Sequence, residues 1–155
     1  PSYYLQDGVV PRTALPGVLA AIDRLSVEHG LAVANVFHAG DGNLHPLILY
    51  RASEEGVNER VKALGGAILR LCIDAGGSIS GEHGVGSDKR CYMDWMFSPE
   101  DQATMQLVRR AFDPQGLANP GKLFPTPRSC GESHRRWQEL KSDHPNSSLA
   151  ALEVV

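Results

Sequence analysis

The chain has 155 residues, of which 42% are hydrophobic, 6% are aromatic and 21% are charged, and its formal net charge at pH 7 is −3. That length suffices for one domain with a substantial core. The small negative charge gives no reason to expect nucleic acid or an anionic membrane surface as a partner, and no apolar run reaches the roughly 18 residues of a transmembrane helix.

The cysteines and the first residues of the chain bear on the cellular compartment of the protein. Cys72, Cys91 and Cys130 are odd in number and widely spaced, with no CxxC pair and no disulfide framework. This pattern favours a reducing compartment, and no signal peptide is visible. We therefore expect a cytoplasmic protein. The first residue is Pro1 and not methionine, which is compatible with a piece of a longer polypeptide.

The opening segments predict a strand and a helix. Residues 3–5 suit a short strand that ends before Asp7-Gly8. Apolar residues then recur at spacings of three and four over residues 15–25, which predicts a helix with one buried face. Thr13 is the expected N-cap of this helix and Gly30 its C-terminal cap.

A β-hairpin is expected next. Residues 31–37 and 47–50 are apolar enough for strands, and the glycine-rich turn between them tolerates positive φ. Both faces of the first strand are apolar or small, so helices should pack on at least one side of the sheet. Pro46 cannot donate to a ladder and is expected at a strand start, an edge or a bulge.

Two further helices are predicted. Ser53-Glu54-Glu55 opens one helix, which Gly76-Gly77 ends, and residues 78–80 follow as a short strand. Ser98-Pro99-Glu100-Asp101 combines the cap, the proline and the acidic residues that are typical of a helix start. This helix runs to the turn at residues 113–116.

These elements together predict an α+β fold, in which an antiparallel sheet has helices packed on one face. The domain covers residues 1–125. Beyond it the hydrophobic periodicity is lost, so residues 126–155 are expected to form a mobile or loosely docked tail.

The hairpin turn brings two histidines together. The midpoint of His38 and His45 falls between Asp41 and Gly42, so a symmetric hairpin makes the histidines cross-strand partners with Cβ atoms roughly 5 Å apart. Two imidazoles at that spacing can share a metal ion, but they also suit hydrogen-bonded turn residues that bind nothing. Asp41 is either a fourth ligand or, more simply, a turn residue that bonds its own backbone.

A second glycine-flanked segment contributes Glu82 and His83. Neighbouring side chains of extended backbone point to opposite sides, so we expect one of the two to ligate a metal while the other faces a substrate. Two histidines and a carboxylate, with open positions left, suit a catalytic divalent ion. The glycine-rich stretches lack the last glycine of a dinucleotide fingerprint, and no GxSxG elbow is present.

Three motifs occur in order: HAGDGNLHP at 38–46, GGSISGEHGVG at 76–86 and FDPQGLANPGK at 112–122. They resemble the C-terminal part of FAD-linked 2-hydroxyacid dehydrogenases. Within that family the glycolate oxidase D subunits are nearest, with D-lactate and D-2-hydroxyglutarate dehydrogenases as relatives. The opening YYLQDGVVPR at 3–12 also fits, and the resemblance extends to about Cys130.

The resemblance implies a cap over FAD, a cofactor bound mainly by a separate N-terminal domain. It implies that His38, His45 and Glu82 hold a divalent metal, often zinc. His83 is implied as the base that takes the hydroxyl proton of a small 2-hydroxy acid while hydride passes to the flavin, and Asn119 as a flavin contact. Other glycolate oxidase subunits are candidate partners, and the inner-membrane periphery is a candidate location.

Two departures from the family bear on the substrate. In the D-2-hydroxyglutarate relatives, a substrate-binding asparagine and lysine stand where this chain has Leu47 and Leu5. A small acid such as glycolate or D-lactate therefore fits better than a dicarboxylate. Nothing resembles the family's FAD pyrophosphate-binding segment, so we expect this chain alone to be inactive. Two alternatives stay open: a stand-alone metal-dependent hydrolase with His83 as base, and a non-catalytic module for subunit assembly.

Overall fold

The structure is a computed structural model that describes residues 2–125. The described residues divide into two compact units, 2–84 and 85–125, and each is described by itself. The expected tail at residues 126–155 lies outside the described residues.

The first unit is built on a four-stranded antiparallel sheet. Its central strand is β4 (Asn43–Tyr50), which pairs along one edge with β3 (Ala32–His38). Along its other edge, β4 pairs with β1 (Ser2–Leu5) and then with β2 (Gly8–Val9). Because successive side chains of a strand point to opposite faces, Leu44 and Ile48 are buried together on one side of the sheet.

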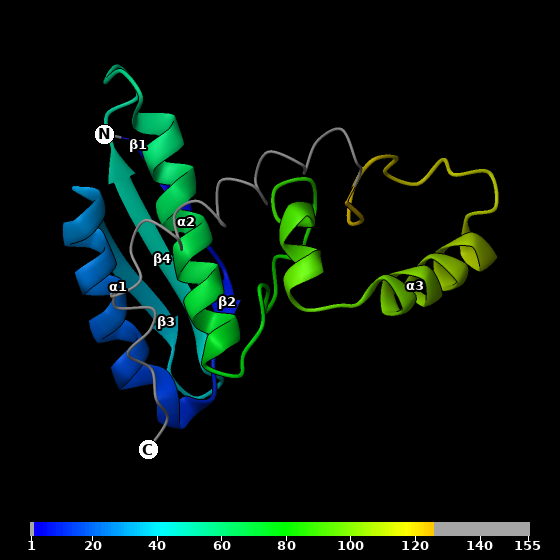
Figure 1. Cartoon of the computed structure of the whole chain (residues 1–155), viewed down its shortest axis with the longest axis horizontal. Helices are drawn as coiled ribbons and strands as arrows, with labels where there is room; N and C mark the ends of the chain where they lie inside the picture. The colour runs from blue at the N-terminus through cyan, green and yellow to red at the C-terminus, as the bar shows by residue number, and fades with distance from the viewer. Residues whose placement is uncertain (1, 126–155) are drawn as a thin grey trace. The chain divides into compact units, whose positions relative to one another are not determined.

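Two helices, α1 (Leu15–His29) and α2 (Val57–Asp74), cover one face of this sheet (Figure 1). Leu44 and Ile48, both 0% exposed, lie in the core beneath them. The other face is open in the described part of the chain, since Tyr3 on β1 is 62% exposed. The predicted α+β class, with helices on one face of an antiparallel sheet, is confirmed.

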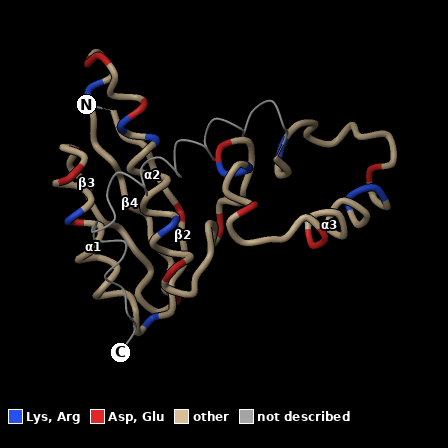
Figure 2. Tube along the Cα trace, viewed as in Figure 1, with Lys and Arg blue, Asp and Glu red and all other residues tan. Residues whose placement is uncertain are grey.

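The charged residues of the first unit lie outside its four strands. None of the four strands contains Asp, Glu, Lys or Arg, so the charged residues of the first unit lie on the helices and connections (Figure 2). Asp7 is the exception within the sheet layer. It sits in the gap between β1 and β2 and is 0% exposed. A buried charge in an apolar layer needs partners, and Asp7 finds them in the loop that follows α2.

The start of α1 differs from the prediction. Residues Arg12–Ala14 form a 3₁₀ turn, η1, so Thr13 lies inside that turn and does not cap the helix. The N-cap is Ala14, which makes no side-chain cap hydrogen bond, and its own N–H donates to the carbonyl of Pro11. At the other end Gly30, with φ of 62°, ends α1 as predicted.

The region around α2 also differs from the prediction. The helix begins at Val57, because residues 52–56 form turns and Gly56 occupies the N-cap with φ of 71°. Ser53 is therefore not its start. The expected strand at 78–80 is reduced to one antiparallel bridge between Ser78 and Val9.

Pro46 lies in the middle of the central strand, so the expectation of a strand start, an edge or a bulge is wrong. Its carbonyl accepts a hydrogen bond from the N–H of Gln6, at 3.1 Å. A hydrogen-bonded pair normally exchanges two such bonds, and proline cannot donate one back. The break between β1 and β2 falls at this position, so the sheet tolerates Pro46 by interrupting the neighbouring strand.

The second unit contains the 3₁₀ helix η2 (Arg90–Trp95) and the helix α3 (Pro99–Phe112). The predicted start of α3 is confirmed: Ser98 and Asp101 form a complete capping box. Cys91 is disulfide-bonded, against the expectation of no disulfide. Among the described residues, no helix has both the length and the apolar character needed to span a membrane.

Candidate metal centre

The hairpin places His38 and His45 on one face of the sheet, but in a different register from the symmetric one. His38, the last residue of β3, pairs with Asn43, and His45 pairs with Val36. The two histidines are therefore diagonal neighbours and not cross-strand partners. Their ring centroids are 5.4 Å apart, with the rings nearly perpendicular. The register prediction is wrong, yet the shared face is as expected.

The shift arises in the turn. The carbonyl of His38 accepts hydrogen bonds from the N–H groups of Asp41 and Gly42, both at 3.0 Å. Gly42 has φ of 72°, and a Cβ at this position would lie 2.1 Å from the carbonyl oxygen of Val10. Only glycine fits there, and it sets where β4 begins. Asp41 is exposed and is not one of the residues grouped as possible metal ligands among the described residues.

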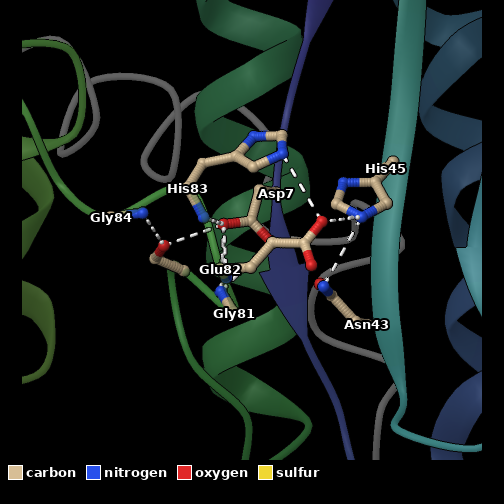
Figure 3. Close-up of polar contacts among 8 residues, drawn as sticks. Asp7, Asn43, His45, Gly81, Glu82, His83 and Gly84 are labelled. Atoms are coloured by element: carbon tan, nitrogen blue, oxygen red, sulfur yellow. Dashed lines mark hydrogen bonds and ion pairs between the residues drawn. The ribbon is translucent and has the colours of Figure 1, made fainter.

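Glu82 and His83 both face His45, so the expectation that they point to opposite sides is not met. The carboxylate Oε1 of Glu82 lies 2.9 Å from His45 Nε2 and 3.5 Å from His83 Nε2 (Figure 3). The rings of His45 and His83 stack, with centroids 5.0 Å apart. The reason is that the segment is a bend and not an extended strand.

Burial differs among these groups. His45 lies on the central strand and is 7% exposed. The side chains of Glu82 and His83 are 52% and 45% exposed, and His38 is exposed as well. Asn43 lies beside the group, with Nδ2 3.5 Å from His45 Nε2. One fixed imidazole thus stands at the bottom of a site that opens to solvent.

The donor set fits a divalent cation. One ligand atom from each of His38, His45 and Glu82 lies within 4.8 Å of the others. Tetrahedral zinc with ligands at about 2.1 Å needs donors roughly 3.4 Å apart. The exposed side chains of His38 and Glu82 have room to close that difference. The other ring nitrogen of His45, Nδ1, is buried without a hydrogen-bond partner in the described part of the chain, so no protein acceptor there fixes its tautomer.

Asn119, the candidate flavin contact, belongs to the second unit. It has φ of 46°, an unusual value for a residue other than glycine. Its carbonyl and that of Ala118 accept hydrogen bonds from the guanidinium of Arg109. Asn119 also lines an open pocket of about 480 Å³ within that unit.

Sequence reasoning missed Asp7. In the sequence it reads as a residue that ends a strand, whereas in the structure its carboxylate accepts hydrogen bonds from the loop that carries Glu82 and His83 (Figure 3). The available signal was a single acidic residue between two apolar stretches. That signal is weak, because aspartate followed by glycine usually marks a turn.

The chain matches a known protein family over most of its length. Residues 1–123 match the family described as FAD linked oxidases, C-terminal domain.

Individual relatives show the same similarity. The chain is 56% identical over 132 residues to the glycolate oxidase subunit GlcD of Escherichia coli (strain K12), covering 85% of this chain and 26% of that protein. It is 36% identical over 124 residues to the subunit of the same name from Bacillus subtilis (strain 168), covering 80% and 26%. It is also 36% identical over 119 residues to the D-lactate dehydrogenase of Archaeoglobus fulgidus, covering 76% and 26%. The chain spans about a quarter of the length of these curated relatives.

Proposed function

Because the chain belongs to the family of FAD-linked oxidase C-terminal domains, we propose that it is the substrate-side part of a flavin-dependent dehydrogenase. The reaction is oxidation of a small 2-hydroxy acid to the 2-oxo acid. Glycolate and D-lactate are the proposed substrates, supported by the names of the relatives. The observation that carries the proposal is the meeting of His38, His45, Glu82 and His83 on one open sheet face.

Three of these residues would hold the metal. His38, His45 and Glu82 provide two imidazole nitrogens and a carboxylate, a set that suits zinc and leaves positions open. A bound cation supplies a Lewis acid for the hydroxyl and carboxylate oxygens of the acid. The hydride acceptor is FAD, held by a separate domain.

His83 is the proposed base. Its Nε2 lies close to the Glu82 carboxylate, and its ring is held against that of His45. The ring nitrogen that carries no hydrogen takes the proton of the substrate hydroxyl, while the C2 hydrogen leaves with its electron pair for the oxidant. The side chain is 45% exposed, so the proton can pass on to water.

The open face also supports a substrate with one carboxylate. Leu5 and Leu47 are cross-strand partners, and Leu47 lies two residues beyond His45 on the same side of β4. Two leucines offer no hydrogen bond to a second carboxylate, and burying an unpaired charge against them is costly. Glycolate and D-lactate therefore suit this surface better than a dicarboxylate.

Two further assignments belong to the proposal. Asn119, in its turn beside Arg109, is the candidate for a contact with the flavin. The FAD-binding domain and the other subunits of a glycolate oxidase are the proposed protein partners. The open sheet face that bears the site, with Tyr3 and Val36 exposed on it at 62% and 54%, is the surface offered to the FAD-binding domain.

Metal content tests the ligand assignment. We expect the purified chain to contain about one equivalent of a divalent metal by elemental analysis, and His38→Ala to lose it. His29→Gln is the matched control, since it removes an imidazole at the end of α1, outside the ligand group. Equal metal in the wild-type chain and His38→Ala, or metal in neither, would contradict the assignment.

Activity tests the role of His83. In a hybrid enzyme, this chain replaces the matching residues of the Escherichia coli relative. Glycolate-dependent dye reduction can then be measured. Loss of a general base costs typically 10²- to 10⁴-fold, so we expect His83→Gln to lower kcat by about that factor while His29→Gln changes it little. An unchanged kcat in His83→Gln would favour the assembly-module alternative. Metal-dependent ester hydrolysis by the chain alone would favour the hydrolase alternative.

A further inference from the structure

A buried carboxylate lies directly behind the site. Asp7 is 0% exposed and sits in the sheet layer. Leu5 lies opposite Leu47 and Gly8 opposite Leu44, so the same register puts Asp7 opposite His45. Its place in the fold therefore fixes it next to the buried ligand of the candidate metal centre.

The carboxylate of Asp7 binds the backbone of the loop that carries Glu82 and His83. Oδ2 accepts hydrogen bonds from the N–H groups of Glu82 at 3.2 Å and His83 at 3.0 Å (Figure 3). The N–H of Gly81 lies 3.1 Å from Oδ1 and 3.0 Å from Oδ2. Successive N–H groups that converge on one anion form a nest, a strong and directional arrangement.

Ser80 extends this arrangement by one residue. Its hydroxyl donates to Asp7 Oδ2 at 2.8 Å and accepts from the N–H of Gly84, also at 2.8 Å. The contacts thus run along the whole loop from Ser80 to Gly84. Glycines at both ends of such a loop leave its backbone free to take many conformations unless something holds it.

The residue that holds the loop is itself rigidly placed. The N–H of Gln6, just before Asp7, donates to the carbonyl of Pro46. Gly8, just after it, packs so closely on α2 that a Cβ there would lie 2.8 Å from Cys72 Sγ. The residues on both sides of Asp7 are therefore held, one by the central strand and the other by α2, and a rigid support of this kind is what a precise site requires.

We propose that Asp7 is a positioning residue, which fixes the direction in which the loop presents Glu82 and His83 to His45. It touches neither substrate nor cofactor and acts through the backbone N–H groups of the loop. The inference rests on the proposed function for the identity of the site, but the holding of the loop by Asp7 stands on contacts of its own. The sequence motifs that carry the family resemblance do not assign this role.

Amide hydrogen exchange of the full chain tests the holding step without any metal. We expect Asp7→Ala to speed exchange at Gly81, Glu82 and His83 by at least about tenfold, because their acceptor is lost. Asp7→Asn keeps the shape of the side chain but only one of its two acceptor oxygens. Its effect on exchange should therefore lie between those of the wild type and Asp7→Ala. Ser80→Ala should act mainly at Gly84. Unchanged exchange at the loop in Asp7→Ala would overturn the proposal.

Two controls separate positioning from general destabilisation. Asp23→Asn removes an exposed carboxylate on α1, and Ile22→Val thins the core at a residue that is 0% exposed. Neither should change the loop amides relative to those of β3 and β4. If Asp7→Ala does not fold, Asp7→Asn and Ser80→Ala still decide the matter, and loop exchange unchanged in both would overturn the proposal.

Co²⁺ titration, followed by its visible absorption, tests the consequence for the site. Loss of a residue that holds metal ligands in place typically costs 10- to 100-fold in metal affinity. We therefore expect the Kd for Co²⁺ to rise by about that factor in Asp7→Asn and to stay unchanged in Ile22→Val. If the wild-type chain binds no Co²⁺ while Asp7→Ala frees the loop, the metal assignment fails and the holding of the loop stands. If Co²⁺ binds equally to wild type and Asp7→Asn, the positioning role is overturned.

Discussion

Two loops of this chain are held by one device, a carboxylate that accepts several backbone N–H groups. In the first unit Asp7 holds residues 80–84. In the second unit Asp113 accepts from the N–H groups of Leu117 and Ala118, both at 2.9 Å. The chemistry is the same, but the first carboxylate is more than 70 residues away from its loop, and the second is four or five residues away.

That separation decides what each loop depends on. The first loop forms only if the sheet and α2 have already placed Asp7, so its order is tied to the whole unit. The second loop closes over a short contour, at a small cost in entropy, and Arg109 adds hydrogen bonds to the carbonyls of Ala118, Asn119 and Lys122. A buried, distant anchor thus links a candidate active-site loop to global stability, whereas a local anchor makes an independent turn.

The largest effect is expected at Gly77, which joins α2 to the first loop. A Cβ there would lie 1.7 Å from the carbonyl oxygen of Val9, and backbone cannot yield to it. Gly77→Ala should therefore lower the free energy of unfolding of the first unit by about 3 kcal/mol, measured by urea unfolding. Amides of Val9 and Ser78, which form the bridge beside it, should exchange faster. An unfolding free energy equal to that of the wild type would show that the loop is not linked to the sheet here.

A smaller and local effect is expected at Gly116 in the second loop. It has φ of +68°, and a Cβ added there would meet open space. Gly116→Ala should cost about 1 kcal/mol from the left-handed backbone alone. Because the anchor is local, faster amide exchange should be confined to residues 116–118. Faster exchange throughout the second unit would remove the contrast between the two loops.

The smallest effect is a pH dependence at Asp113. Hydrogen bonds from the N–H group of Ala118 and, to a smaller extent, from that of Leu117 lower the pKa of this carboxyl below its ordinary value of 3.8. A lowered pKa in the folded state contributes stability above the ordinary value, and that contribution is lost as the pH falls through the lowered value. Asp113→Asn should therefore exchange faster than wild type at Leu117 and Ala118 near pH 6. The difference should shrink below about pH 3.8; a difference independent of pH would exclude the carboxylate as its source.

Local signals in the sequence predicted the parts of the fold that depend on few residues. The capping box at Ser98 and the helix end at Gly30 followed from residue types within one turn. The hairpin and the shared face of His38 and His45 followed from apolar strands around a glycine-rich turn. The glycine-flanked segment had already singled out Glu82 and His83, and the family resemblance added their separate roles; the structure brings both side chains to His45.

The parts that escaped prediction depend on contacts between distant segments. The hairpin register is set in a turn whose N–H groups bind the carbonyl of His38, and in that turn the carbonyl of Val10 leaves room only for glycine at position 42. The central position of Pro46 follows from an interruption in the neighbouring strand. The bend that turns both Glu82 and His83 toward His45 depends on Asp7. None of these contacts leaves a periodic trace in the sequence.

The hairpin register also bears on the order in which His38 and His45 would release a bound cation. His38 ends an edge strand beside an exposed turn, whereas His45 is buried on the central strand, where it pairs with Val36 of β3. Strand ends and exposed turns open far more often than central strands do. A cation held between these two imidazoles would therefore depart by release from His38 first, with His45 as the last ligand to let go and the first to recapture it.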